Sequence, residues 1–227
     1  MVITIPKVLN EHEVQQYQKH LRQAAWQSGQ ATAGSQAGQV KQNWQLDQHS
    51  ELAQQLGDHI LQVLSQTPEF VSSALPLKIY PPMFNRYQDG AHYGWHVDNA
   101  IRLLPNSPSR LRTDLSATLF LNHADEYEGG ELVIQGHHGE QTVKLNAGDL
   151  VVYPSTSLHQ VTPVTRGQRL ASFFWIESMI MDHEMRSVLF DLDQSVQKLT
   201  QAQGANSPDV LTLSGIYHRL LRLHATT

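Results

Sequence analysis

Four side chains of this sequence could together activate oxygen at a metal ion. His96 and Asp98 form a His-x-Asp pair, and His159 and then Arg169 follow much later in the chain. Two imidazoles and one carboxylate are the ligand set of non-haem Fe(II) oxygenases, which leaves half of the metal's octahedral coordination open. A guanidinium in the same cavity would hold a carboxylate co-substrate, because its planar fork matches both carboxylate oxygens. If the four side chains converge, they predict an oxygenase that uses Fe(II) and 2-oxoglutarate.

A His-x-Asp pair is a weak signal by itself, and the sequence holds a second one, His123 with Asp125. Residues i and i+2 of an extended strand point to the same face, so a pair on a strand can reach one metal ion. His96 and Asp98 lie in or just after a predicted strand, whereas His123 and Asp125 lie in an acidic segment before a turn. We therefore expect the metal site at His96 and Asp98, with His159 as the third ligand. The alternative for His159 alone is a strand histidine held by hydrogen bonds.

Arg169 stands near the start of an apolar run that predicts an extended strand over 168–177. The alternation of a strand puts four side chains on one face, Arg169, Ala171, Phe173 and Trp175. A guanidinium on an inward face is costly unless it is paired, and a dianionic ligand would supply the partner. The open alternative is an arginine at a strand start that contacts solvent or a surface acid.

The composition limits the class of protein. The chain has 227 residues, of which 40% are hydrophobic, so it can bury the core of one large domain, with or without a small appendage. The net charge of −5 argues against a broad nucleic-acid-binding face. There is no cysteine, which excludes disulfides and thiolate metal sites. We see no secretory signal and no apolar run of the ~20 residues that span a bilayer, so we expect a cytoplasmic protein without membrane or nucleic-acid partners.

Apolar spacing predicts helices before and after a long β-rich region. A capping box at Asn10 and Glu13 starts the first helix, which we expect to end near 28, and a second amphipathic helix covers about 52–63. Residues 180–200 and 208–224 again have helical spacing. Between these helices, turn residues separate short predicted strands at 77–80, 83–88, 92–97, 114–122, 131–135, 141–145, 150–153, 158–163 and 168–177.

Many short strands at regular spacing are typical of a β-sandwich or barrel. The whole pattern predicts a mainly β protein with flanking helices: a double-stranded β-helix (jelly roll) core, an N-terminal helical layer and a C-terminal helical appendage. We expect one domain over 1–178, with its core at about 77–178, and a helical extension over 179–227. The extension could cover one end of the barrel or form a homo-oligomer interface, and its apolar spacing fits both.

Three motifs resemble those of prolyl-4-hydroxylase-type oxygenases. The run Tyr-x-x-Gly-x-x-Tyr-x-x-His-x-Asp occupies 87–98, Gly-Gly-Glu-Leu occupies 129–132, and the turn Asn-Ala-Gly-Asp at 146–149 leads into the strand before the last histidine. Each motif is weak alone, but together they are specific. The sequence resembles most closely the bacterial PKHD-type hydroxylase family, which also has a C-terminal helical extension, and the likeness covers nearly the whole chain.

The resemblance implies an Fe(II)- and 2-oxoglutarate-dependent dioxygenase, with L-ascorbate as a supporting reductant. By motif, His96, Asp98 and His159 would bind the iron, and Arg169 would bind the distal carboxylate of 2-oxoglutarate. Tyr87 matches a tyrosine whose hydroxyl hydrogen-bonds 2-oxoglutarate in related enzymes, and a buried strand tyrosine is the alternative. The implied reaction consumes 2-oxoglutarate and O2, releases succinate and CO2, and hydroxylates a substrate C–H bond.

The substrate stays open at this point. Residues 99–113 are predicted to form a long loop next to the His-x-Asp pair, and Arg102, Arg110 and Arg112 lie in it. Loops at the mouth of a barrel often carry specificity, so this loop could select an anionic small molecule or an acidic peptide. The other interpretation is a solvated loop whose arginines pair with the acidic segment 125–128.

Other classes of function also stay open. A prolyl-type hydroxylase that acts on a partner chain has the same sequence signature as a small-molecule hydroxylase. A nucleic-acid demethylase would need a basic groove and stacking aromatics, which the net charge disfavours. A non-enzymatic metal-binding jelly roll needs no carboxylate clamp, so Arg169 argues against it.

Overall fold

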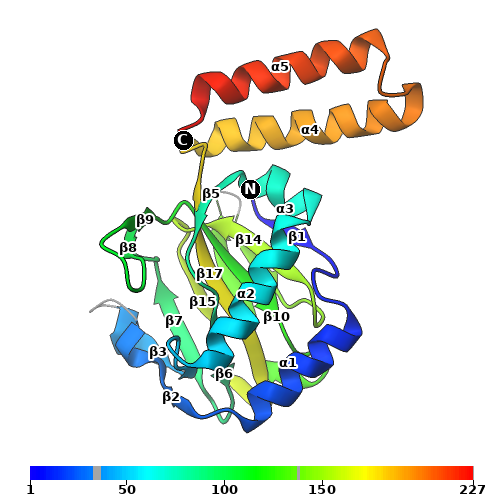
Figure 1. Cartoon of the computed structure of the whole chain (residues 1–227). Coiled ribbons are helices and arrows are strands. Elements are labelled where there is room, and N and C mark those ends of the chain that lie inside the picture. Colours follow the sequence, from blue (N-terminus) through cyan, green and yellow to red (C-terminus); the bar gives the residue numbers. More distant parts are fainter. Residues whose placement is uncertain (33–36, 137–138, 227) are drawn as a thin grey trace.

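The computed structural model describes residues 1–32, 37–136 and 139–226. Two antiparallel sheets face each other as a jelly roll, helices cover the outer face of the larger sheet, and a helical hairpin extends from one end (Figure 1). The predicted architecture is therefore confirmed: a mainly β core with an N-terminal helical layer and a C-terminal helical appendage.

The larger sheet joins strands from the start, the middle and the end of the β-rich region. The side chains of its central strand β10 are buried on both faces, because helices pack on one side and the smaller sheet on the other. The path of the sheet is β1 (Ile3–Ile5), β14 (Leu150–Pro154), β10 (Leu115–Phe120), β17 (Arg169–Ser178), β6 (Met83–Tyr87), β4 (Trp44–Leu46) and β2 (Trp26–Ser28), and β5 (Pro76–Ile79) also pairs with β17.

The smaller sheet carries both histidines of the predicted metal site. Its strands follow the order β13 (Gly139–Val143), β12 (Leu132–Gly136), β15 (His159–Val161), β7 (His92–His96) and β3 (Lys41–Gln42). Two further strand pairs stand apart from the sheets, β8 (Ile101–Leu103) with β9 (Arg110–Arg112) and β11 (Tyr127–Gly129) with β16 (Val164–Gly167). An apolar cluster with Tyr87, Ile134 and Val161 fills part of the space between the sheets.

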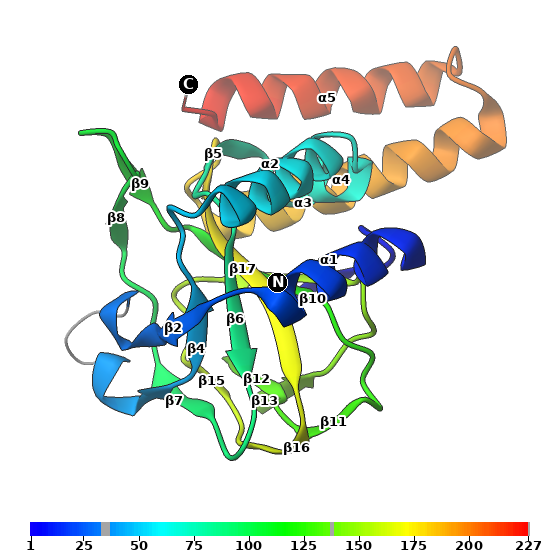
Figure 2. The ribbon, with the colours of Figure 1, turned by 60° about the horizontal axis from the view of Figure 1, so that its bottom comes forward.

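Three helices form the N-terminal layer on the larger sheet: α1 (Glu11–Gln23), α2 (Glu51–Ser65) and α3 (Pro68–Ala74) (Figure 2). The capping box that starts α1 is present. The backbone N–H of Glu13 donates to the side chain of Asn10, and the backbone N–H of Asn10 donates to the side chain of Glu13. The expected end of this helix near 28 is wrong, because residues 26–28 leave the helix to pair with β4 as β2. Two short 3-10 helices, Gly29–Thr32 and Ala37–Val40, follow β2.

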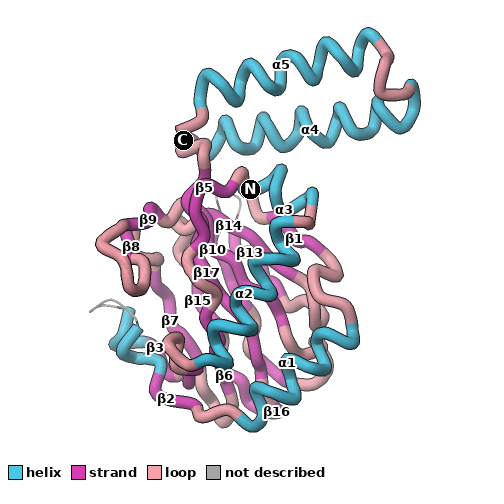
Figure 3. The backbone as a smooth tube through the Cα atoms, viewed as in Figure 1, coloured by secondary structure: helices cyan, strands magenta, loops and turns pink. Residues whose placement is uncertain are grey.

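The C-terminal hairpin consists of two long helices, α4 (His183–Gln203) and α5 (Pro208–His224), as predicted (Figure 3). Its two ends meet at one place. The guanidinium of Arg186 donates to the carbonyl of Ile180 at 2.6 Å, and the backbone N–H of Thr226 donates to the carbonyl of Met179 at 2.8 Å. Within the described residues, none of the helices has the length and apolarity needed to span a bilayer.

The segment 99–113 is not the long loop that the sequence predicts. Strands β8 and β9 pair in antiparallel register, from Ile101 opposite Arg112 to Leu103 opposite Arg110. Leu111 is buried against Trp175 at the end of the jelly roll. The buried side chain of Leu111 and six paired residues make the segment a hairpin, although proline and serine dominate its tip.

Candidate active site

His96, Asp98 and His159 converge in the space between the two sheets. One possible ligand atom of each lies within 4.8 Å of the others, and Nε2 of His159 is 3.7 Å from Oδ2 of Asp98. The two histidines meet because β15 pairs with β7 in a register that sets His159 opposite His96. Asp98 follows two residues after His96 and reaches the same face. The competing pair, His123 and Asp125, is exposed on the segment between β10 and β11.

A backbone carbonyl fixes the ring of each histidine. Nδ1 of His96 donates to the carbonyl of Gly94 at 2.8 Å, and Nδ1 of His159 donates to the carbonyl of Ser157 at 3.0 Å. A neutral imidazole that donates through Nδ1 keeps its lone pair on Nε2, the atom that a metal needs. Both rings are therefore held in the tautomer of a metal ligand, each by the residue two positions before it.

Side chains hold the rest of the cluster in place. Oδ2 of Asp98 accepts from the hydroxyl of Ser116 at 2.6 Å, and that hydroxyl lies 2.7 Å from the hydroxyl of Ser155. The ring of Tyr93 stacks on the imidazole of His96 with 3.5 Å between centroids. Burial, and then the charge of the neighbouring imidazole, lower the pKa of His96 to about 4. This imidazole is therefore neutral at pH 7, and a metal can bind there without displacing a proton.

Arg169 lies in the same cavity with donors that have no partner. Its side chain is 1% exposed, and β17 pairs with β6 so that it stands opposite Tyr87. The guanidinium carbon lies 5.4 Å from the ring centroid of Tyr87 and 5.1 Å from that of Phe120. Nε and Nη1 make no hydrogen bond to any described residue. A buried guanidinium with unused donors is costly, so this end of the cavity fits an anionic ligand.

The Gly-Gly-Glu-Leu sequence makes room for this arginine. Gly130 has a φ of +67°, and a Cβ there would lie 3.0 Å from Cδ of Arg169 and 2.8 Å from Cγ2 of Val164. Gly129 has a φ of +73°, and a Cβ there would lie 1.9 Å from the carbonyl oxygen of Pro163. Only glycine adopts this backbone without strain and at this distance. Steric contacts and backbone conformation thus explain why this motif contains two glycines.

One cavity joins these groups. It encloses about 690 Å³ of space without protein atoms, the open solvent at its mouth included. Both sheets contribute to its walls. Every residue that the sequence predicts for the site lines it, namely His96, Asp98, His159, Arg169 and Tyr87. Phe173 and Trp175 also line it, as the alternation along β17 predicts.

A polar inward face on residues 41–45 was not predicted. Lys41, Asn43 and Gln45 line the cavity and are buried, with 3%, 6% and 1% exposed. Burial, and then the charge of Arg102, lower the pKa of Lys41 to about 7. The amide of Asn43 has no hydrogen-bond partner among the residues described. The sequence does show polar residues at every second position, 41, 43 and 45, but this pattern normally indicates the solvent-exposed face of a strand.

The three arginines of the 99–113 segment have different surroundings. The guanidinium carbon of Arg102 lies 3.8 Å from the ring centroid of Trp175, and its side chain lines the cavity. Arg110 is exposed on the hairpin. Of the three arginines, Arg102 alone lines the cavity. The hypothesis that this segment selects an anionic substrate stays a prediction.

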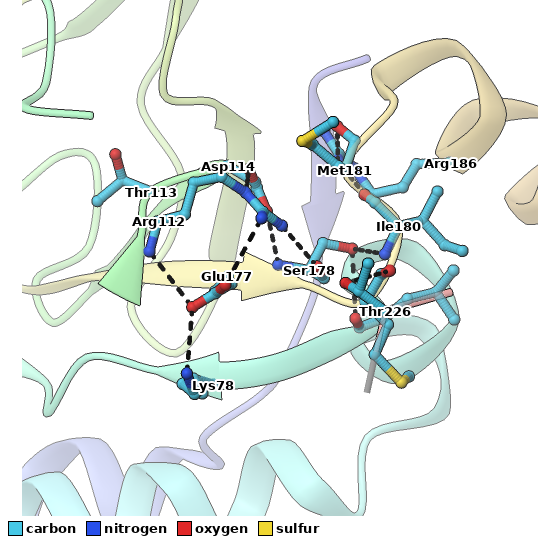
Figure 4. Close-up of polar contacts among 12 residues, drawn as sticks. Lys78, Arg112, Thr113, Asp114, Glu177, Ser178, Ile180, Met181, Arg186 and Thr226 are labelled. Carbon is cyan, nitrogen blue, oxygen red and sulfur yellow. Dashed lines mark hydrogen bonds and ion pairs between the residues drawn. The ribbon is translucent and has the colours of Figure 1, made fainter. Parts of the chain in front are cut away.

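Arg112 instead joins the hairpin to the base of the C-terminal helices (Figure 4). Its Nε and Nη2 donate to the two carboxylate oxygens of Asp114 at 2.7 and 2.9 Å. Nη2 also donates to the carbonyl of Ser178 at 3.2 Å, and Nη1 lies 3.6 Å from Glu177. Pairing with the acidic segment 125–128 is therefore wrong for Arg112.

The jelly roll with this cavity defines the class of protein. Residues 82–177 match the 2OG-Fe(II) oxygenase superfamily, and residues 183–226 match the PKHD-type hydroxylase C-terminal domain. The class is thus that of Fe(II)- and 2-oxoglutarate-dependent dioxygenases. Relatives named "PKHD-type hydroxylase" extend the match to the whole chain: one from Acidovorax ebreus is 57% identical and covers 98% of both chains, and one from Saccharophagus degradans is 53% identical and covers 100% of both. The chain belongs to the PKHD-type hydroxylase family, as the motifs predict.

Solved structures share the fold at low sequence identity. A Pseudomonas putida prolyl-4-hydroxylase is 22% identical with a TM-score of 0.53, covering 78% of this chain and 92% of its own. A Trichoplax adhaerens prolyl hydroxylase, solved with a hypoxia inducible factor peptide fragment, is 14% identical with a TM-score of 0.58, covering 82% and 86%. HygX from Streptomyces hygroscopicus, with nickel, 2-oxoglutarate and hygromycin B bound, is 15% identical with a TM-score of 0.54, covering 78% and 82%. These likenesses show the jelly-roll fold.

Proposed function

We propose that this enzyme hydroxylates a C–H bond of its substrate. In the balanced reaction, one atom of O2 enters the new hydroxyl group and the other enters succinate, while 2-oxoglutarate loses CO2. The main support for the proposal is that one cavity holds both a set of possible metal ligands and a separate binding point for an anion. Three potential metal ligands, two of them imidazoles with fixed tautomers, stand at one place, and a buried guanidinium with unused donors stands at another.

His96, Asp98 and His159 would hold the iron, and the donor set fits Fe(II) because it combines two imidazoles with one carboxylate. When bound, the iron together with 2-oxoglutarate supplies the oxygen-activating chemistry. Arg169 would hold the distal carboxylate of 2-oxoglutarate through a two-point hydrogen bond. Tyr87, its cross-strand neighbour, would hydrogen-bond the same ligand through its hydroxyl.

The chain's own contribution is positioning and exclusion of water. Carbonyls at 94 and 157 hold the imidazoles, and Ser116 holds the carboxylate of Asp98. Tyr87 and Phe120, which belong to the apolar cluster between the sheets, lie against the guanidinium of Arg169, and this side chain is 1% exposed. Burial of this kind would keep competing water away from its donors. Fixed donors in a dry site bind a charged ligand without a reorganisation cost at the moment of reaction.

Several finer expectations stay predictions. They are the use of L-ascorbate as reductant, a cytoplasmic location, a division into an oxygenase domain over 1–178 and an extension over 179–227, and homo-oligomer formation through the C-terminal helices. The substrate can be a small molecule or a residue of a partner chain. The second of these is supported by the solved prolyl hydroxylase that holds a peptide fragment.

Turnover without added substrate tests the proposal. Fe(II)-dependent release of succinate from 2-oxoglutarate is expected for the purified protein, and the variants His96→Ala and Asp98→Ala should lose it. His123→Ala is the matched control, because it removes an exposed histidine from the competing His-x-Asp pair. Full turnover in either site variant would contradict the assignment. Stoichiometric metal binding without any succinate release would instead favour a non-enzymatic metal-binding module.

A further inference from the structure

The cavity has a second cationic region far from Arg169. The ammonium of Lys41 lies 5.1 Å from the ring centroid of Tyr93 and 5.9 Å from that of Phe173. The guanidinium of Arg102 stacks on Trp175 at 3.8 Å. Lys41 belongs to the edge strand β3 and Arg102 to the β8–β9 hairpin. Both side chains line the cavity.

The spacing along β17 separates this region from the arginine expected to bind 2-oxoglutarate. Arg169, Phe173 and Trp175 lie on one strand, four and six residues apart. At ~3.3 Å per residue, the backbone positions of Phe173 and Trp175 are therefore roughly 13 and 20 Å from that of Arg169. The charged groups also contact different rings: Arg169 lies over Tyr87 and Phe120, whereas Lys41 lies over Tyr93 and Phe173. The two cations therefore offer a binding region separate from the arginine expected to bind 2-oxoglutarate.

The charges of the lining residues favour anionic ligands. Among the described residues that line the cavity, Asp98 is the only carboxylate, whereas Lys41, Arg102 and Arg169 are cationic. This excess of cationic side chains attracts negatively charged molecules into the cavity.

The cations also stand beside the metal site. Tyr93, which contacts the ammonium of Lys41 on its ring, stacks on His96 at 3.5 Å. Asp98 is close enough to favour the charged form of Lys41. A molecule held by Lys41 and Arg102 would thus lie next to the three potential metal ligands, where the substrate of an oxygenase must lie.

We propose that Lys41 and Arg102 bind an oxyanion group of the substrate, a carboxylate or a phosphate, and so position a neighbouring C–H bond for hydroxylation. This inference rests on the proposed function, because it takes the second ligand of the cavity to be the substrate. It assigns the wall of Tyr93, Phe173 and Trp175 to the apolar part of the same molecule.

The first experiment uses the wild-type protein loaded with Fe(II) and 2-oxoglutarate under argon, where no turnover occurs. Binding of 2-oxoglutarate is checked first, by calorimetry and by the visible absorption of its iron chelate. Benzoate, phenyl phosphate and the neutral benzamide are then titrated into the loaded protein. We expect either anion to bind at least roughly 10-fold more tightly than benzamide, as hydrogen bonds to charged groups require. The preferred anion distinguishes a carboxylate substrate from a phosphate.

The second experiment removes each cation. Lys41→Met and Arg102→Met keep the length and apolar contacts of the side chains, and each should weaken the preferred anion about 10-fold or more without a matching loss for benzamide. Arg110→Met is the control, because this arginine is exposed on the same hairpin. Equal binding of benzamide and both anions by the wild type would overturn the inference, and this comparison needs no variant. Failure of 2-oxoglutarate to bind at all would instead refute the proposed function.

Discussion

Replacing Arg169 with methionine should separate ligand binding from folding. The guanidinium is 1% exposed, and two of its nitrogens have no hydrogen-bond partner in the described structure. In the ligand-free protein, burial of this guanidinium therefore lowers the stability of the fold. Methionine fills a similar volume between Tyr87 and Phe120 without an unused donor. The variant should bind 2-oxoglutarate much more weakly and should fold as stably as the wild type.

The two effects have opposite signs and can be sized. Removing one partner of a buried, hydrogen-bonded charge pair costs ~2–5 kcal/mol, so the affinity of Arg169→Met for 2-oxoglutarate should fall roughly 30-fold to several thousandfold. Exchange of a buried charge for an apolar side chain of similar size is often neutral or stabilising by ~1–4 kcal/mol. The free energy of unfolding of the metal-free variant should therefore be equal to or above that of the wild type.

Two measurements on the same preparations test this prediction. Calorimetric titration of 2-oxoglutarate into Fe(II)-loaded protein under argon gives the affinity, and urea denaturation of the metal-free protein gives the stability. Arg166→Met is the control, since that arginine forms an exposed ion pair with Glu128 and should change neither value appreciably. The reasoning fails if Arg169→Met binds 2-oxoglutarate within about threefold of the wild type, or if it lowers the unfolding free energy by more than about 1 kcal/mol.

Three further outcomes follow from the site. Gly130→Ala should destabilise the protein by about 1–3 kcal/mol, because φ is +67° and the new methyl meets Arg169, and it should also weaken 2-oxoglutarate in calorimetry; an unchanged melting curve would contradict the steric role of the glycine. Ser116→Ala should lower metal affinity about 10–100-fold in a chelator competition, because Asp98 loses the hydroxyl that orients it; wild-type affinity would show that the serine does not matter. The pKa of His96 is lowered to about 4, so between pH 6.5 and pH 4 this histidine takes up a proton in the unfolded chain but not in the folded, metal-free protein. The free energy of unfolding should therefore be unaffected by His96 above pH 6.5 and fall by up to about 3 kcal/mol as the pH is lowered toward 4. Denaturation curves from pH 7 to pH 4 measure it, and His96→Gln should flatten this part of the pH dependence.

The sequence predicted the residues whose spacing is local and whose partners lie on regular strands. His96 and Asp98 are two residues apart on one extended segment, and the alternation along 169–175 put Arg169 on the face of Phe173 and Trp175. Both features depend only on the period of a strand. The capping box at the start of α1 is equally local, and it too is present.

The features that the sequence did not predict depend on pairing between distant segments. Strands β2, β3 and β4 have two or three residues each, too few for a period to show. They exist because β4 pairs with β6 and β3 pairs with β7. Lys41 consequently enters the cavity from a segment whose polar residues, read alone, indicate a surface. The end of α1 was misjudged for the same reason, since pairing with β4 draws 26–28 out of the helix.

The base of the C-terminal hairpin and the mouth of the cavity are joined by a short series of hydrogen bonds. Met179 and Ile180 bind the segment after α5 and the first turn of α4, and α4 also packs on α3. Next to them, Ser178 is tied through Arg112 to the β8–β9 hairpin, whose other strand carries Arg102. A displacement of the helices at their base would therefore be transmitted to a side chain that lines the cavity.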